Sequence, residues 1–109
     1  MLRLEIEELL EATVVRCSGR IVKGDGADTL LRAAKSAKEP RIQIDLNGVE
    51  AIDAAGLGAL AELERWARDA NRKIQWMNPS KRVRAVLKLT RLGSVLGVYP
   101  DAPVRPQAA

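Results

Sequence analysis

The sequence predicts a single α/β domain with a mixed sheet of four to five strands, flanked by about three or four helices. Its 109 residues match the usual size of one domain, and 47% of them are hydrophobic. Short apolar segments with a two-residue period alternate along the chain with longer segments of helical period. Such alternation is typical of a domain whose later strands are parallel.

The chain is expected to begin with two strands. Apolar and charged residues alternate over residues 2–7, which is the pattern of a half-buried strand with Leu4 and Ile6 on its inner face. Residues 12–17 form a second, β-branched run that we expect to end at Ser18-Gly19. The short segment between the two runs predicts a hairpin turn, so this pair would be antiparallel and the sheet mixed.

A loop at Lys23–Gly26 precedes the first expected helix. Asp25 is placed to cap this helix, with Asp28 three residues further on as in a capping box. Apolar residues recur at helical spacing over residues 27–34. Pro40 then ends the helix, because proline restricts the residue before it and cannot donate a hydrogen bond.

The middle of the chain predicts a strand, a helix and another strand. Residues 41–46 alternate as a strand, and Asn47-Gly48 is a turn signal. A helix is expected from about Ala55 to Asn71, with its apolar residues on one face. Residues 73–77 form a short apolar strand.

The last expected helix begins at Asn78-Pro79, with proline at the first helical position, where its missing N–H does no harm. Leu92-Gly93 ends it. We expect the domain to span residues 1–99 and residues 100–109 to form a flexible C-terminal tail.

The composition excludes several kinds of chemistry. The chain has no histidine, so it cannot build a Ser-His-Asp or Cys-His relay. Its one cysteine, Cys17, supplies neither a disulfide nor a zinc site and is expected to be a small buried hydrophobe. The charged N-terminus is not a signal peptide, and no apolar run is long enough to span a membrane. We therefore expect a cytoplasmic protein with no catalytic residue, metal or cofactor and no membrane insertion.

Positive charge is concentrated late in the chain. Residues 1–69 hold 10 basic and 13 acidic residues, whereas residues 70–100 hold 7 basic residues and no acidic one. Four of the basic residues share a stripe on the last helix: Lys81, Arg84, Lys88 and Arg91. Such asymmetry is found in nucleic-acid-binding surfaces, but a solvated helix face explains it more simply.

One segment is more informative than the rest. Residues 45–60, and above all Asp53-Ala54-Ala55-Gly56-Leu57-Gly58, resemble the central signature of the STAS domain family, to which bacterial anti-sigma factor antagonists belong. In that signature a strand leads through a short loop to Asp-Ser-Ser-Gly-Leu-Gly at a helix start. Residues 19–22 and 78–92 are similar to two further family segments, so the resemblance covers nearly the whole chain.

The resemblance implies a binding module for partner switching in transcription regulation and signal transduction. The unmodified antagonist would bind an anti-sigma factor, usually a small kinase, and free the sigma factor. In the family, phosphorylation of the second hydroxyl residue of the motif ends this complex. Here that position is Ala55 and its neighbour is Ala54, and no Ser, Thr or Tyr lies between Ser36 and Ser80. The usual phospho-switch is therefore expected to be absent.

The expected partner surface joins the motif to the first loop. Asp53 would cap the helix, and Gly56 and Gly58 would allow close backbone approach. Trp66 could add a partly exposed anchor. The expected contact residues are Asp53, Ala54, Ala55, Gly56 and Leu57, with Lys23, Gly24, Asp25 and Gly26 beside them.

Two other functions remain open. STAS domains also occur as subunits bound to ATPases of lipid-transport systems and as parts of signalling assemblies. Nucleic-acid binding through the basic stripe ranks lower, because no aromatic residue accompanies the stripe. An enzyme ranks lowest, and the oligomeric state stays open.

Overall fold

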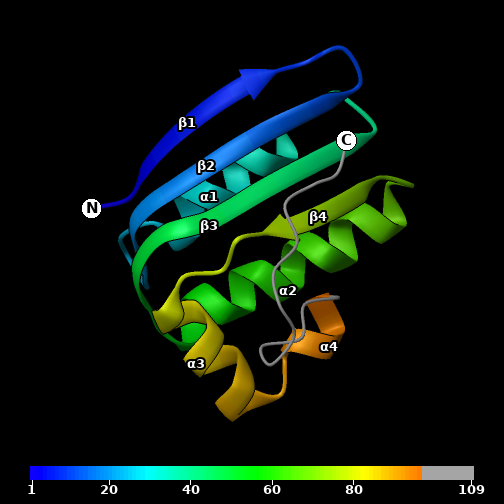
Figure 1. Cartoon of the computed structure of the whole chain (residues 1–109). Helices are drawn as coiled ribbons and strands as arrows, with labels where there is room; N and C mark the ends of the chain where they lie inside the picture. Colours follow the sequence, from blue (N-terminus) through cyan, green and yellow to red (C-terminus); the bar gives the residue numbers. More distant parts are fainter. Residues whose placement is uncertain (97–109) are drawn as a thin grey trace.

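Four strands form one sheet in the order β1-β2-β3-β4 in the computed structural model, which describes residues 1–96 (Figure 1). The strands are β1 (Arg3–Glu8), β2 (Ala12–Ile21), β3 (Arg41–Ile52) and β4 (Lys73–Met77). β1 is antiparallel to β2, and β2, β3 and β4 are parallel. The predicted mixed α/β sheet is therefore confirmed, with four strands. The expected tail at 100–109 lies outside the described residues.

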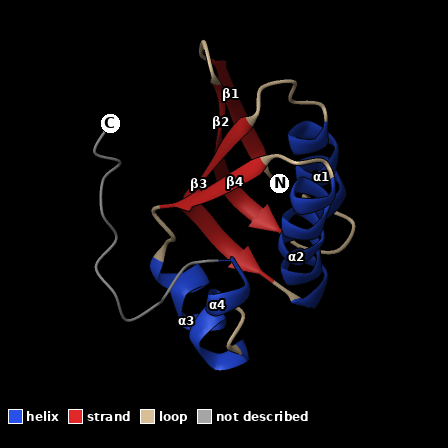
Figure 2. Ribbon diagram, turned by 90° about the vertical axis from the view of Figure 1, so that its right-hand side faces the viewer, coloured by secondary structure: helices blue, strands red, loops and turns tan. Residues whose placement is uncertain are grey.

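Helices α1 (Ala27–Lys35) and α2 (Ala54–Asp69) lie on one side of the sheet (Figure 2). Helices α3 (Lys81–Thr90) and α4 (Gly93–Leu96) follow near one end of the sheet (Figure 2). Among the helices of residues 1–96, none is both long and apolar enough to cross a membrane.

The core lies between the sheet and the helices. Ile42 and Ile44 of β3 are fully buried together with Leu60 and Leu63 of α2. Alternate strand residues point to the other face, where Gln43 donates a hydrogen bond to Gln75 at 3.1 Å. The two-residue period thus separates an apolar face from a polar one, as the sequence predicted.

Two predicted strand ends were wrong. β2 continues through Ser18-Gly19 to Ile21, and β3 continues through Asn47-Gly48 to Ile52. Gly48 lies where β3 passes so close to β2 that an added Cβ would come within 2.7 Å of the Ser18 Cβ. Glycine is needed there for the approach of two strands and not for a turn.

The inner face of β1 is also less buried than predicted. Leu4 packs against the core, but Ile6 is 52% exposed. The register of β1 against β2 runs without a shift from Arg3 opposite Ser18 to Glu8 opposite Thr13. β1 is therefore a regular edge strand with an apolar side chain partly in solvent.

The starts of α1 and α3 differ from expectation as well. The N-cap residue of α1 is Gly26, and no side chain caps this helix, so the predicted capping role of Asp25 and Asp28 was wrong. The Asp25 carboxylate instead pairs with the Met1 amine at 3.1 Å. α3 begins after Ser80 and not after Asn78-Pro79, because the Ser80 hydroxyl accepts from the Val83 N–H at 3.2 Å.

The C-terminal ends of α2 and α3 lie close to their predicted positions. α2 ends at Asp69, two residues before the expected end at Asn71, and Ala70 is exposed. α3 ends at Thr90, followed by Arg91 in the left-handed region at φ 59°. Gly93 therefore starts α4 and does not end α3.

Candidate functional site

The Asp53 carboxylate accepts hydrogen bonds from two segments of the chain near the carboxyl ends of the parallel strands. Its Oδ1 accepts from the Gly56 N–H at 2.8 Å, which caps α2 as predicted. Its Oδ2 accepts from the Lys23 N–H at 3.0 Å, in the loop between β2 and α1. One carboxylate therefore fixes the start of α2 and the Lys23 loop relative to each other.

The same hydrogen bonds set the charge of Asp53. Donation from the Lys23 N–H and then from the Gly56 N–H lowers the pKa of the Asp53 carboxyl below its ordinary value of 3.8. A carboxylate at a helix N-terminus is also favoured by the helix dipole. Asp53 is consequently ionised at neutral pH and acts as a structural anion.

The Lys23 loop is a tight turn whose ends hydrogen-bond each other. The Val22 N–H donates to the Asp25 carbonyl at 2.9 Å, and the Asp25 N–H donates back at 3.0 Å. Gly24 has φ 75° and Gly26 has φ 109°, both in the region that favours glycine. A Cβ added at Gly26 would lie 2.1 Å from the Arg20 carbonyl oxygen, so this loop packs directly on the end of β2.

The motif residues divide into an outer and an inner set. Ala54 is exposed and Ala55 is partly exposed, whereas Gly56 and Leu57 are buried. An added Cβ at Gly56 would lie 2.0 Å from the Ile21 carbonyl oxygen, so the predicted close approach is confirmed there. At Gly58 nothing lies within 4 Å of such a Cβ, and the same prediction was wrong.

The structure brings together all the sequence-predicted contact residues, but only some of them are accessible. Lys23 and Gly24 are exposed beside the alanines, whereas Gly26 is buried. A partner docking here would touch Ala54, Ala55 and the tip of the loop. The buried residues of the motif hold that surface in position.

An open hollow of about 450 Å³ lies between α1 and α2 next to Ala55. Small and apolar residues form much of its lining, and charged residues complete it. The lining consists of Lys23, Gly24, Ala27, Asp28, Leu31, Ala55, Gly58, Ala59 and Glu62. Beyond it, the Lys35 ammonium pairs with the Glu62 carboxylate at 2.7 Å and links the two helices.

The sequence-based prediction missed the helical part of this hollow. Ala55, Gly58, Ala59 and Glu62 follow one another at i, i+3, i+4 and i+7, which places them on one helix face. That spacing was available in the sequence. Ala59 is buried there, and Gly58 beside it is exposed.

Other candidate groups lie apart from this site. Burial, and secondarily the charge of Asp45, raises the pKa of the Cys17 thiol to about 12, so it stays protonated. Within residues 1–96, no group of three or more Cys, Asp or Glu side chains could hold a metal ion. Trp66 is partly exposed, as predicted, but the Arg72 guanidinium lies over its ring at 5.3 Å.

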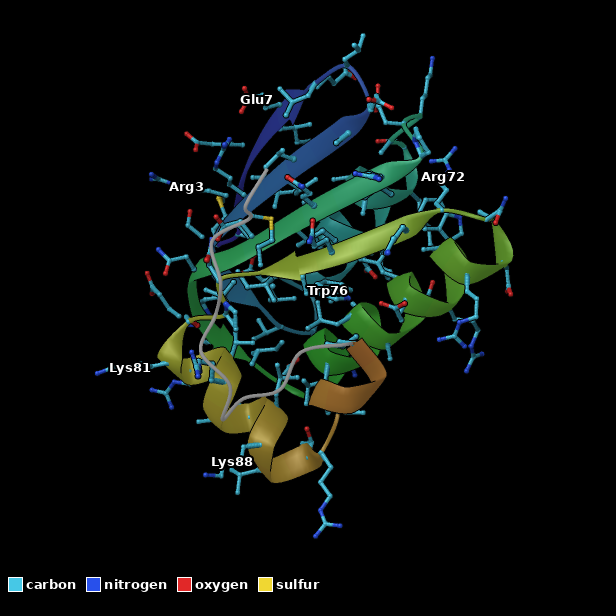
Figure 3. All side chains as sticks on the ribbon, turned by 45° about the vertical axis from the view of Figure 1, so that its right-hand side comes forward. Arg3, Glu7, Arg72, Trp76, Lys81 and Lys88 are labelled. Atoms are coloured by element: carbon cyan, nitrogen blue, oxygen red, sulfur yellow. The ribbon has the colours of Figure 1, made fainter. Side chains whose placement is uncertain are left out.

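Three residues of the predicted basic stripe, Lys81, Arg84 and Lys88, lie on α3, and the fourth, Arg91, follows its end. Lys81 and Lys88 extend from this helix into solvent, away from the sheet (Figure 3). Trp76, by contrast, is buried in β4 and its indole N–H donates to Glu64 at 2.9 Å. No aromatic residue belongs to α3, so the stripe has charge without a stacking platform.

Solved structures share this fold. An anti-sigma factor antagonist from Mycobacterium paratuberculosis matches with a TM-score of 0.74 and 24% identity, over 92% of this chain and 86% of that chain. The antagonist SpoIIAA of Bacillus matches with a TM-score of 0.66 and 18% identity, over 84% of this chain; the match covers 84% of its unphosphorylated form and 86% of its phosphorylated form.

A third structure, of Mglu, matches with a TM-score of 0.64 and 22% identity over 71% of this chain. The matched part is only 20% of the Mglu chain, so this likeness concerns one part of a larger protein. A comparison with curated proteins finds no match.

The family comparison covers most of the chain. The family model described as "Mlab, STAS domain" matches residues 4–97, which include all the strands and helices described above except Arg3, the first residue of β1. The motif from Asp53 to Gly58 lies at the junction of β3 and α2 within this match. The chain therefore belongs to the STAS domain family.

Proposed function

We propose that this STAS domain is a non-catalytic binding module of the cytoplasm that docks an anti-sigma factor at the start of α2 and thereby frees a sigma factor. The observation that carries the proposal is the pair Ala54-Ala55, of which Ala54 is exposed and Ala55 partly exposed. Asp53 holds this pair against the Lys23 loop, beside the hollow between α1 and α2. The fold shared with two anti-sigma factor antagonists supports it.

The surface has properties that suit protein docking. It is fixed before binding, because the Asp53 carboxylate is bonded to both segments that form it. A preformed surface loses little conformational entropy when it binds. Its centre is small and uncharged, whereas Lys23, Asp28 and Glu62 lie around the hollow. A partner can thus bury the centre without burying an unpaired charge.

The usual switch is missing from this surface. SpoIIAA has a phosphorylated and an unphosphorylated form, but neither Ala54 nor Ala55 offers a hydroxyl. A phosphate would add a charge of about −2 at the centre of the interface and oppose docking. With alanine there, the chain stays in the form that binds, and control must act on its partner or on its amount.

A second candidate function uses the same surface. The chain would be a STAS subunit of a lipid-transport ATPase or of a signalling assembly. Two observations favour keeping it: the matching family model is described by the name Mlab and not as an antagonist, and a permanent subunit needs no phospho-acceptor. Nucleic-acid binding through α3 ranks below both.

The two candidates make different predictions in one experiment. The purified chain is added to a complex of sigma factor and anti-sigma factor from the source organism, and free sigma factor is measured by size-exclusion chromatography. We expect release in proportion to the added chain. No release, together with tight binding to a transport ATPase of the same organism, would replace the first candidate with the second.

The missing hydroxyl can also be restored. In an Ala55→Ser variant, we expect a kinase-type anti-sigma factor with ATP to add one phosphate group, detected by intact-mass spectrometry. The wild type is the matched control and should gain no mass at this position. An unmodified variant in the presence of a bound, active kinase would show that the surface is not presented as in a switched antagonist.

A further inference from the structure

Exposed apolar side chains of the described structure gather at the edge strand β1. Four of the five large hydrophobic side chains that are exposed lie in β1 or in the residues that flank it; they are Met1, Ile6, Leu9 and Leu10, with exposures of 47 to 96%. The fifth is Leu89 on α3. The other edge strand, β4, buries its large apolar residues Ile74 and Trp76. Exposed apolar residues are therefore gathered at one edge of the sheet.

β1 also lacks two of the usual obstacles to strand pairing, a proline and a bulge. It contains no proline, and its register against β2 has no bulge, whereas the register of β2 against β3 shifts twice. Within residues 1–96, β1 lies outermost in the sheet, and one side of its backbone has no neighbouring strand (Figure 1). An edge of this kind is a template for a further strand.

From this edge we infer that the chain forms a homodimer, in which β1 of one copy pairs antiparallel with β1 of a second copy across a twofold axis. The residues at which two such strands meet directly must point to the same face of the sheet. Because faces alternate along a strand, the numbers of two paired residues must have an even sum. Only a few registers remain.

Charge selects one register. If Leu4 lies on the twofold axis opposite its own copy, Arg3 of each copy lies opposite Glu5 of the other. On the helix side, Ile6 of each copy then lies opposite Leu2 of the other. If Glu5 lies on the axis instead, two like charges meet there. If Ile6 lies on the axis, Glu5 meets Glu7 twice. Directly opposed like charges destabilise a sheet, so the Leu4 register is favoured.

The remaining acidic residues do not oppose this register. Glu7 already pairs with Arg16 of its own chain at 3.1 Å. Arg16 lies directly opposite Glu5 in the β1–β2 register and adds positive charge beside it. Arg3 and Glu7 project from β1 away from the helices, and both are exposed (Figure 3). The pairing covers Ile6, which the helices of its own chain leave half in solvent.

The dimer is expected to be weak. Adding one short strand to another buries less than the roughly 1,000 Å² or more of stable interfaces. Dimerisation is therefore measured by sedimentation equilibrium of the whole chain from about 10 µM to about 1 mM. We expect a reversible monomer–dimer equilibrium within this range. A chain that stays monomeric throughout overturns the proposal.

Charge reversal tests the register. Arg3→Glu alone and Glu5→Arg alone should each weaken dimerisation about tenfold, because two opposed pairs become repulsive. The double variant restores both pairs with their charges exchanged and should return to within about threefold of the wild type. A register with Glu5 on the axis predicts no rescue, so absence of rescue overturns the pairing proposed here.

A substitution at an apolar residue of β1 distinguishes loss of the dimer interface from loss of folding. Ile6→Lys places a charge opposite the apolar Leu2 of the other copy and should abolish dimerisation. Leu89→Lys, at the exposed hydrophobic on α3, is the matched control and should leave it unchanged. Urea denaturation at low concentration checks that each variant folds. Equal effects of the two variants would contradict the edge proposal. Ala55→Glu, at the proposed docking surface, should leave the dimer intact, so this inference can fail independently of the proposed function.

Discussion

Helices α2 and α3 both begin with a side-chain cap near the carboxyl end of the parallel strands, but their surroundings differ. At α2 the Asp53 carboxylate reaches the Lys23 loop, and the next two residues, Ala54 and Ala55, are small and at least partly exposed. At α3 the Ser80 hydroxyl accepts from Val83 and donates to the Val49 carbonyl at 2.7 Å. Pro79 before it is buried.

The difference shows that a side-chain helix cap can either attach a helix to the sheet or hold an open surface in position. The cap of α3 attaches a helix to β3 at a place where β3 extends beyond β4, and it completes the core. The cap of α2 fixes a loop and a helix start while leaving the outer residues in solvent. A surface of small residues that is rigid and open is suited to binding, whereas a cap bonded to a strand of the sheet is suited to stability.

The largest effect is expected at Gly56, which brings α2 against β2. Gly56→Ala would place a Cβ 2.0 Å from the Ile21 carbonyl oxygen, so the free energy of unfolding should fall by about 3 kcal/mol. Gly58→Ala is the matched control, since nothing lies within 4 Å of its Cβ, and it should stabilise the helix by about 0.5–1 kcal/mol. Urea denaturation measures both. Equal stability of the two variants would show that α2 does not need this close approach.

The next effect is expected at Asp53. Asp53→Asn keeps an acceptor for the Gly56 N–H but replaces the oxygen that accepts from Lys23 by an amide donor. It should therefore release the Lys23 amide to faster hydrogen exchange while α2 stays protected. Asp53→Ala should expose both amides. Unchanged exchange at Lys23 in both variants would rule out the proposed tether.

Asp53 also predicts a pH dependence. Its pKa is lowered in the folded chain, so its contribution to stability is present above its ordinary pKa of 3.8 and is lost as the pH falls through the lower, folded value. The stability difference between the wild type and Asp53→Ala should be constant above about pH 5 and shrink in more acidic solution. Denaturation curves across this range measure it. A difference that grows on acidification would contradict the assignment.

A smaller effect is expected at Ser80. Ser80→Ala removes the cap of α3 and the hydrogen bond to Val49, and it should lower the free energy of unfolding by about 1–2 kcal/mol. Thr90→Ala, at the exposed end of the same helix, should change it by less than about 0.5 kcal/mol. Partner binding should be unaffected by either. If the Ser80→Ala variant is fully folded and yet loses partner binding, α3 belongs to the docking surface.

The sequence was sufficient for features that depend on local periodicity. The limits of β4, the apolar face of α2 and the cap at Asp53 all follow from the order of side chains along a few turns or strand residues. The motif placed Ala54 and Ala55 at a helix start next to the first loop, and the structure has them there.

The errors arose where a distant contact decides a local choice. Asn47-Gly48 has the composition of a turn, yet Gly48 serves the passage of β3 against Ser18 of another strand. Asp25 has the position of a cap, but it pairs with the chain terminus. The hollow beside Ala55 needs two helices, so neither helix predicts it alone. Such features depend on which elements meet, and periodicity does not contain that information.

The proposed docking surface is tested most directly by titrating a purified anti-sigma factor of the source organism with two variants of equal charge. Ala55→Glu places a carboxylate in the middle of the surface at the start of α2, and Leu89→Glu places one on α3. Calorimetry should show that Ala55→Glu binds at least about tenfold more weakly than the wild type, with Leu89→Glu unchanged and both variants fully folded. Equal affinity of Ala55→Glu and the wild type would contradict the assignment of this surface.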